Sequence, residues 1–208
     1  MNVAELFIEK SKRKNFYNIM PIENIPSVMK HGILSNYNDK KTKHESVASV
    51  DVQSRRENKM VPNVGNLHSY ANCYFDCRNP MMYKIKIKNM IKSICVLIIK
   101  PEILNIEGVV ISDRNASSDY AYFAGPWHMI SNDKLQYDKI YARYWNDVDQ
   151  KKKYILGSIK CAEVLVPNSI PYEYVESAIV FDEGVKNKLS EKEFDKEIFV
   201  NADLFFGG

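Results

Sequence analysis

Short apolar runs separated by polar, turn-forming stretches recur along this chain, and the pattern predicts several short β-strands. The runs are rich in valine, isoleucine and aromatic residues, which are enriched in strands. They do not alternate clearly with helices as βαβ units would, so we expect a mixed α+β fold. The predicted strands span Phe16 to Met20, Ser93 to Lys100, Val109 to Ser112, Ile159 to Val166 and Ser177 to Phe181.

Boundary residues predict a short helix from Ile25 to His31. Asn24 can cap its first turn, Pro26 is tolerated there, and Gly32 can end it. Two more helices are predicted from Pro101 to Ile106 and from Asp133 to about Trp145, and residues 1 to 15 form a short helix or an arm.

Three stretches have no clear period. Residues 35 to 66 are polar and predict a long loop, a feature that is usually functional or mobile in a compact domain. Residues 113 to 132 are rich in turn formers. After Asn79-Pro80 the cap and the proline favour a helix, whereas the alternation of Tyr83, Ile85 and Ile87 favours a strand.

Composition narrows the class of protein. With 208 residues, 45% of them hydrophobic and 26% charged, we expect one soluble domain over residues 1–208 with a sizeable core. We find neither a membrane-length apolar run nor a signal-peptide pattern, so we expect a cytoplasmic protein without a membrane partner. The four cysteines are too few for a disulfide scaffold, and the Cys73-x-x-x-Cys77 pair lacks a second ligand pair, so we predict no metal.

Basic residues gather in three stretches although the net charge is only +3. The stretches are residues 10–14, residues 84–100 with five lysines and no acid, and residues 151–153. Such asymmetry is compatible with a polyanion on one face, and equally with solvated lysines on strands and loops.

The chain lacks a phosphate-binding glycine loop, a zinc-protease motif and a nucleophile elbow. One carboxylate has an unusual position: Glu163 stands at the edge of the apolar run Val164 to Val166. A buried acid without a partner is costly, so such a residue is usually paired or functional unless it faces solvent. Arg55-Arg56 is either a surface basic pair or part of a site. Residue-level reasoning ends at an α+β domain with an Arg/Glu site.

Four segments together resemble the DarT family, the DNA ADP-ribosyltransferase toxins of DarT–DarG toxin–antitoxin systems. Their order and spacing agree with the family over roughly residues 15 to 180, and the third segment is the most specific. The segments are residues 16–34 (FYNIMPIENIPSVMKHGIL), residues 49–56 (SVDVQSRR), residues 67–83 (LHSYANCYFDCRNPMMY), and YARYW from Tyr141 followed by AEVLV from Ala162.

The resemblance implies two small sheets that split to form an NAD cleft, with NAD cleaved at its nicotinamide–ribose bond. Glu163 would stabilise the positive charge that develops on the ribose or take the proton of the attacking base, and Arg56 would bind NAD phosphates or the substrate side of the cleft. The remaining NAD-binding positions that it implies are Asn18, Met20, Asn24 and Gly32.

The resemblance also places single-stranded DNA on the third segment and on a loop beginning near Asn115. Tyr74 and Tyr83 can stack on bases or be half-buried core aromatics, Arg78 can contact phosphate or a base edge, and Met81 lies between them. The implied partners are single-stranded DNA and a macrodomain antitoxin of the DarG type.

Two departures from the family pattern concern the NAD site. The family's histidine is Asn18 here and its threonine is Met20, so an amide replaces a titratable ring and a hydroxyl is lost. Three functions therefore stay open: transfer of ADP-ribose to a DNA base, transfer to RNA or protein, and nucleic-acid binding without catalysis. The residues do not choose between thymine and guanine.

Overall fold

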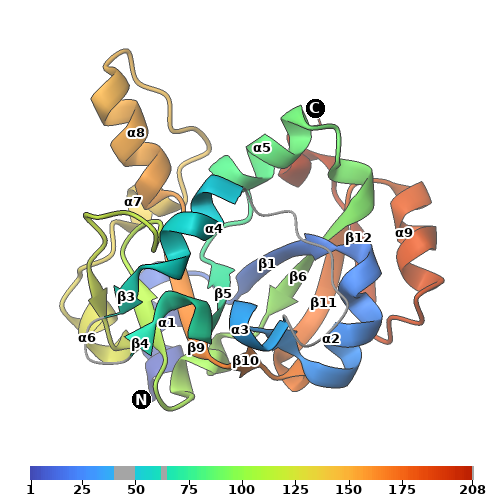
Figure 1. The fold of residues 1–208 in the computed structure, drawn as a ribbon, viewed down its shortest axis with the longest axis horizontal. Coiled ribbons are helices and arrows are strands. Elements are labelled where there is room, and N and C mark those ends of the chain that lie inside the picture. The colour runs from blue at the N-terminus through green and yellow to red at the C-terminus, as the bar shows by residue number, and fades with distance from the viewer. Residues whose placement is uncertain (40–49, 62–64, 208) are drawn as a thin grey trace.

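A computed structural model describes residues 1–39, 50–61 and 65–207 of the chain. Its centre is an eight-stranded sheet in the order β12-β11-β6-β1-β5-β9-β7-β8 (Figure 1). Two small two-stranded sheets, β10-β2 and β3-β4, lie beside it. The strands are β1 (Phe16–Pro21), β2 (Ile33–Leu34), β3 (Met60–Val61), β4 (Gly65–Asn66), β5 (Tyr70–Tyr74), β6 (Ile94–Ile99), β7 (Val110–Ser112), β8 (Phe123–Ala124), β9 (Glu163–Pro167), β10 (Ser169–Ile170), β11 (Val175–Val180) and β12 (Glu197–Val200).

The large sheet consists of two halves that are joined weakly at its middle. β1 pairs with β6 along its whole length, from Phe16 to Pro21. It pairs with β5 only through Tyr17 and Tyr74. β5 then pairs with β9 over five residues. Since β11 and β12 are parallel and the other neighbours antiparallel, the sheet is mixed. The predicted α+β class is confirmed, and the seam between β1 and β5 divides the sheet.

Side chains alternate between the two faces of the sheet, as the pleat requires. In β6, Cys95, Leu97 and Ile99 belong to the main core, while Ile94 and Val96 belong to a second cluster. The main core includes Phe7 of α1 (Val3–Ser11), stacked on Phe16 of β1 at 4.6 Å between ring centroids. The second cluster includes Met82 of α5 (Pro80–Ile87). α1 and α5 therefore cover opposite faces.

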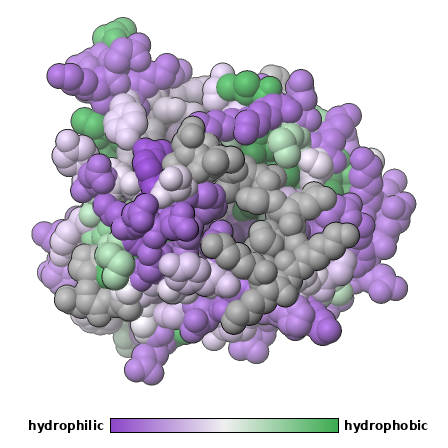
Figure 2. Space-filling model, viewed as in Figure 1, coloured by the Kyte–Doolittle hydropathy of each residue, from purple (hydrophilic) through white to green (hydrophobic). Residues whose placement is uncertain are grey.

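Helices surround the sheet, and one of them projects from the body of the molecule. α8 extends outward from the rest of the chain (Figure 1) and presents a mostly hydrophilic surface (Figure 2). No described helix combines the length and apolar character needed to cross a membrane. The helices are α1 (Val3–Ser11), α2 (Ile25–His31), α3 (Asn36–Asp39), α4 (Val50–Glu57), α5 (Pro80–Ile87), α6 (Pro126–Ser131), α7 (Tyr137–Ile140), α8 (Gln150–Ile159) and α9 (Glu183–Ser190), with 3-10 turns at Ile22–Asn24, Leu67–Ser69, Ile91–Ser93, Pro101–Asn105, Tyr172–Tyr174 and Ala202–Phe205.

The segment after Asn79-Pro80, for which the sequence allowed a helix or a strand, is a helix with a capped first turn. The Asn79 side chain accepts hydrogen bonds from the backbone N–H groups of Met81 and Met82, and α5 follows as a helix. The prediction of a loop over residues 35–66 is wrong in its described part, which contains α3, α4, β3 and β4; residues 40–49 and 62–64 lie outside the described chain.

Two predicted elements have different bounds in the structure. The strand predicted from Ile159 begins only at Glu163, because Ile159 is the last residue of α8, which is capped by Asp149. The helix predicted from Asp133 is reduced to the single turn of α7. Asp133 has φ 50°, a left-handed conformation that does not start a helix.

Candidate active site

Glu163 is the first residue of β9 and lies near the middle of the large sheet. Its neighbours across the two flanking strands are Tyr74 of β5 and Ser112 of β7. The residue is 1% exposed. The alternative of a glutamate that faces solvent at the edge of the apolar run is therefore wrong, because the side chain is fully buried.

Three hydrogen bonds satisfy the buried Glu163 carboxylate. Arg56 of α4 directs Nη1 at both oxygens, 3.1 Å from Oε1 and 2.9 Å from Oε2. The backbone N–H of Ala116 donates to Oε1 at 2.9 Å. A buried carboxylate needs such compensation because its desolvation otherwise costs several kcal/mol. The site thus holds a fixed negative charge whose geometry is set by one guanidinium and one loop.

Tyr74 and Met81 lie on the β5 side of Glu163. The Tyr74 hydroxyl donates to Met81 Sδ at 3.0 Å. Burial, and then the neighbouring Glu163 charge, raise the pKa of Tyr74 well above its usual 10.0, so the phenol stays protonated. The structure therefore brings together four predicted site residues, Glu163, Arg56, Tyr74 and Met81.

Asn115 organises the loop on the other side of Glu163. Its Oδ1 accepts hydrogen bonds from Ser117 N at 2.9 Å and Ser117 Oγ at 2.7 Å, and its backbone N–H donates to Ser158 O at 2.8 Å. This local turn holds the next residue, Ala116, with its N–H toward Glu163. Residue patterns alone did not reveal Ala116 and Ser112, because their contributions come from the backbone and from strand register.

Asn18 lies at the seam between the two half-sheets. Its Nδ2 donates to the backbone oxygen of Asn72 in β5 at 2.8 Å. Its Oδ1 is buried and has no hydrogen-bond partner among the described residues. An unsatisfied buried acceptor is costly, and a bound ligand with a donor group would relieve it.

Met20, Asn24 and Gly32, the other predicted NAD-binding residues, each have a local structural environment in the fold. Met20 is 7% exposed and packs in the main core. Asn24 precedes α2, but its side chain makes no capping hydrogen bond there. Gly32 has φ +74°, and a Cβ at this position would lie 2.4 Å from Ile170 O, so glycine is needed where the chain passes β10. Their roles toward NAD stay predictions.

Arg78 and Tyr83 lie away from Glu163, against the C-terminal segment. The Arg78 guanidinium donates to the backbone oxygen of Asp203 and stacks over Phe206 at 4.1 Å. Tyr83 is 44% exposed and packs against Trp145 and Phe206. The structure does not bring these two predicted DNA-binding residues to the carboxylate.

Lys160, three positions before Glu163, forms a second buried ion pair with Asp76. Lys160 Nζ lies 2.5 Å from Asp76 Oδ2 and 2.9 Å from the backbone oxygen of Ile140, and the lysine is fully buried. The pair ties the turn before β9 to the turn after β5. Sequence reasoning missed it, because a single lysine in the chain gives no sign of burial or of a partner 84 positions away.

The cysteines show no metal arrangement in the structure. Cys73, Cys77, Cys95 and Cys161 are all buried free thiols. Within the described ranges, no three His, Cys, Asp or Glu side chains gather in a group that could hold a metal ion.

Similarity to solved structures defines the class of protein. The chain superposes on Thermosipho africanus DarTG in complex with ADP-ribose with a TM-score of 0.80 and 25% identity, over 93% of this chain and 51% of that one. It superposes on Thermus sp. 2.9 DarT in complex with ADP-ribosylated single-stranded DNA with a TM-score of 0.78 and 24% identity, over 94% and 96% of the two chains. The fold is that of the DarT ADP-ribosyltransferases.

The family follows from the sequence match. The model described as ssDNA thymidine ADP-ribosyltransferase, DarT, covers residues 17–206, and the chain belongs to this family. It is 27% identical to a DNA ADP-ribosyl transferase–DNA ADP-ribosyl glycohydrolase fusion protein of Thermosipho africanus, over 93% of this chain and 49% of the relative. It is 28% identical to a DNA ADP-ribosyl transferase of Thermus sp., over 81% of this chain and 82% of the relative. The chain thus spans about half of the fusion protein, and the predicted family is confirmed.

Proposed function

We propose that this chain transfers ADP-ribose from NAD to a thymine base of single-stranded DNA and releases nicotinamide. The observation that carries the proposal is the central position of Glu163, with the seam at Asn18 on the β5 side and the Asn115 loop on the β7 side. A carboxylate between two such regions can act on a donor from one side and an acceptor from the other.

The residues at the seam suit NAD as the donor substrate. Asn18 Oδ1 offers an unsatisfied acceptor, and its Nδ2 is already fixed by Asn72, so the amide orientation is set before a ligand arrives. Arg56 spends only Nη1 on Glu163, and within the described chain its Nε and Nη2 donate to no residue. These groups remain as donors for hydroxyl or phosphate oxygens of the substrate.

The chemistry requires one bond to break and one to form at the same ribose carbon. The C1′–nitrogen bond to nicotinamide breaks with its electron pair leaving on nicotinamide, and a ring nitrogen of the base bonds to C1′. The Glu163 carboxylate stabilises the positive charge on the ribose between these events, and the proton of the base nitrogen passes to a carboxylate oxygen or to water. Ala116 N–H and Arg56 keep the carboxylate in place without reorganisation.

Thymine as the acceptor rests on the description of the family model, and the Thermus sp. 2.9 relative was solved with ADP-ribosylated single-stranded DNA. The test is mass spectrometry of single-stranded oligonucleotides, each with one thymine, guanine, cytosine or adenine in a fixed context, after incubation with NAD. We expect one ADP-ribose adduct on the thymine strand alone. Modification of another base, of RNA only, or of none contradicts the proposal.

A second candidate function, nucleic-acid binding without catalysis, is favoured by Asn18 and Met20. Calorimetry separates the two: heat on adding NAD supports the transferase, whereas no heat together with retained oligonucleotide binding supports the binding module.

We also propose a glycohydrolase partner of the DarG type and a toxin role. The Thermosipho africanus relative joins a DNA ADP-ribosyl transferase and a DNA ADP-ribosyl glycohydrolase in one chain. Expression of this chain alone should stop bacterial growth, and co-expression with a DNA ADP-ribosyl glycohydrolase should restore it. Growth arrest that persists in a Glu163→Gln variant would separate the arrest from the transfer reaction.

A further inference from the structure

A cavity of about 450 Å³ lies along one side of α8, close to the candidate active site. Two of its residues adjoin the site directly, since Asn115 precedes Ala116 and Cys161 lies two positions before Glu163. Its volume falls within the range of small-molecule sites. The lining residues come from α4, α5, α8 and the two loops beside α8: Arg55, Pro80, Lys84, Asn115, Ser117, Ser118, Trp145, Gln150, Lys153, Tyr154, Gly157, Ser158 and Cys161.

Two aromatic rings line this cavity. Trp145 enters it from the loop before α8, and Tyr154 from α8 itself. Gly157 lets the indole come close, because a Cβ there would lie 3.3 Å from Trp145 Cδ1 and 3.6 Å from Pro80 Cγ. Tyr154 is 62% exposed although it is a large aromatic residue. Planar rings at a concave surface are suited to stacking on nucleobases.

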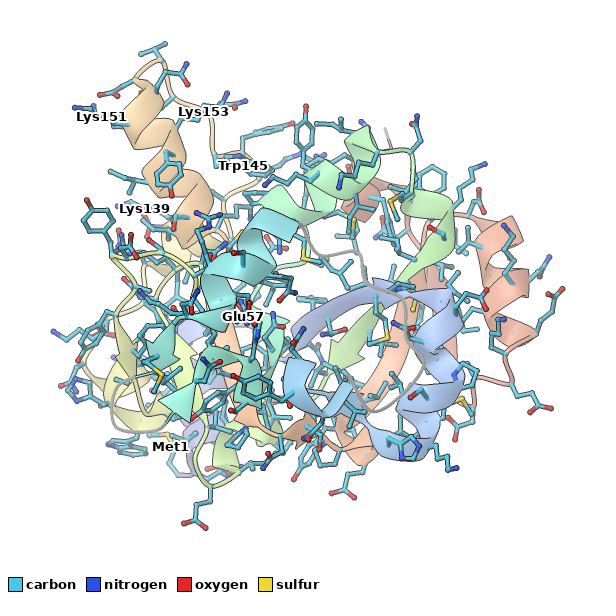
Figure 3. The ribbon with its side chains drawn as sticks, viewed as in Figure 1. Met1, Glu57, Lys139, Trp145, Lys151 and Lys153 are labelled. Atoms are coloured by element: carbon cyan, nitrogen blue, oxygen red, sulfur yellow. The ribbon has the colours of Figure 1, made fainter. Side chains whose placement is uncertain are left out.

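Positive charge and one unsatisfied hydroxyl accompany the rings. Lys84 of α5 and Lys153 of α8 line the cavity, and among the described residues neither has an ion-pair partner. In Figure 3, Lys153 and Trp145 lie on the side of α8 that faces α5, and Lys151 lies on the other side. Ser158 Oγ is buried without a hydrogen-bond partner in the described chain. This combination fits a base together with its phosphate.

We propose that the cavity binds the nucleotide next to the one that is modified, with its base against Tyr154 and Trp145 and its phosphate near Lys153 and Lys84. The inference rests on the proposed function in that the strand reaches Glu163. It goes further by giving this chain a contact with the neighbouring base, and therefore a source of sequence context. None of the DNA-binding residues expected from the sequence except Asn115 lines the cavity.

Two matched pairs of variants test the cavity through binding alone. Lys153→Ala removes a lining lysine, and Lys151→Ala removes a lysine of the same helix outside the lining. Tyr154→Ala removes a lining ring, and Tyr144→Ala removes a ring of equal exposure, 63% against 62%, outside it. All four side chains are exposed, so folding should be retained in each variant.

Fluorescence anisotropy with a labelled single-stranded oligonucleotide gives the affinities. We expect Lys153→Ala and Tyr154→Ala to weaken binding by about fivefold or more, and each control by less than about twofold. Lys153→Ala should also reduce the salt dependence of log K by about 0.7. Equal affinities within both pairs overturn the proposal.

Abasic strands identify the base in the cavity. An oligonucleotide with one thymine is prepared with a single abasic site at each flanking position in turn. The wild-type chain should lose about fivefold in affinity for one position directly beside the thymine, and Tyr154→Ala should lose nothing further there. A Tyr154→Ala loss that is the same for every strand overturns the assignment.

The binding measurements are independent of catalysis. A chain that binds with this pattern but leaves all bases unmodified contradicts the proposed function and supports the cavity. If all four variants modify thymine and bind the oligonucleotide as well as the wild type does, the result contradicts the role of the cavity and supports the proposed function.

Discussion

Two buried ion pairs of the described chain, Lys160–Asp76 and Arg56–Glu163, differ in their surroundings although Lys160 and Glu163 are only three positions apart in the sequence. Lys160–Asp76 is closed within the chain: the ammonium donates to Asp76 and to Ile140 O, and Asp76 Oδ1 accepts the backbone N–H of Arg78. Arg56–Glu163 is equally well buried, with side chains 9% and 1% exposed, but it stands between the seam and the cavity. Burial and pairing alone therefore do not distinguish the two carboxylates; their surroundings in the fold do.

The largest expected effect is a loss of transfer activity when the Arg56–Glu163 pair is changed. Glu163→Gln keeps the shape of the side chain but removes the charge that would stabilise the ribose, so transfer to the thymine strand should fall by about 10³-fold. The measurement is single-turnover transfer with saturating NAD. Transfer within about tenfold of the wild type would remove Glu163 from the catalytic role.

Stability provides the control for this variant. Glu163→Gln leaves the Arg56 charge buried with a weaker partner, so the free energy of unfolding should also fall, by about 2 kcal/mol. Circular dichroism must show a folded chain at the temperature of the transfer assay.

The next effect concerns the closed pair. Lys160→Met leaves Asp76 partly buried without its cation, and we expect a loss of about 3 kcal/mol in the free energy of unfolding by urea. Transfer per folded molecule should stay within about threefold of wild type, because Lys160 contacts no group of the site. A large loss of transfer in a fully folded Lys160→Met chain would mean that this pair also positions Glu163.

Restoring neutrality sharpens the same comparison. Lys160→Met combined with Asp76→Asn should recover part of the lost stability, because no uncompensated charge is then buried. No recovery would show that Lys160 acts mainly through its bond to Ile140 O.

The sequence predicted well where a single local rule decides. The predicted strand from Ser93 to Lys100 has an apolar centre, Ile94 to Ile99, and this centre is β6. After Asn79-Pro80, where the local rules disagreed, the sequence left helix and strand open, and the structure has the helix α5. The α8 helix was missed because three lysines follow Gln150 in its first turn and the helix projects into solvent, so it carries no apolar stripe facing a core. Residues whose role depends on distant strands were beyond such rules.

The site shows the same division. Motif resemblance supplied Glu163 and Arg56, which the structure places in contact. It could not supply the 2.9 Å bond from Ala116 N–H, which depends on a turn 47 positions away, or the burial of Lys160 against Asp76, 84 positions away. These contacts come from tertiary packing.

A moderate effect is expected at the seam. Asn18→Ala removes both the bond to Asn72 O and the unsatisfied Oδ1, so NAD should bind about fivefold more weakly, as measured by calorimetry. Asn18→His, which restores the family's residue, should be tolerated or bind more tightly. Unchanged NAD affinity in Asn18→Ala would place the donor substrate elsewhere.

The smallest expected effect is at the C-terminal segment. The Asp203 carboxylate accepts hydrogen bonds from Arg143 at 2.8 and 3.1 Å, and its Oδ1 lies 3.6 Å from Arg78. Removing this charge with Asp203→Asn leaves Arg78 and Arg143 more positive toward a DNA strand. If Arg78 contacts DNA, as the family resemblance implies, affinity for a single-stranded oligonucleotide should rise about twofold at low salt and be unchanged at high salt.

The pH dependence of this effect has a definite sign. The hydrogen bonds from Arg143 lower the pKa of Asp203 below its usual 3.8. The carboxylate therefore contributes its interaction above that usual value and loses it only as the pH falls through the lowered pKa. The twofold difference between Asp203→Asn and wild type should accordingly be the same at about pH 6 and about pH 8. Glu183→Gln, on α9 and far from α8 (Figure 1), is the matched control for removal of one acidic charge. An equal rise in that control would attribute the effect to net charge and leave Arg78 without a part in DNA binding.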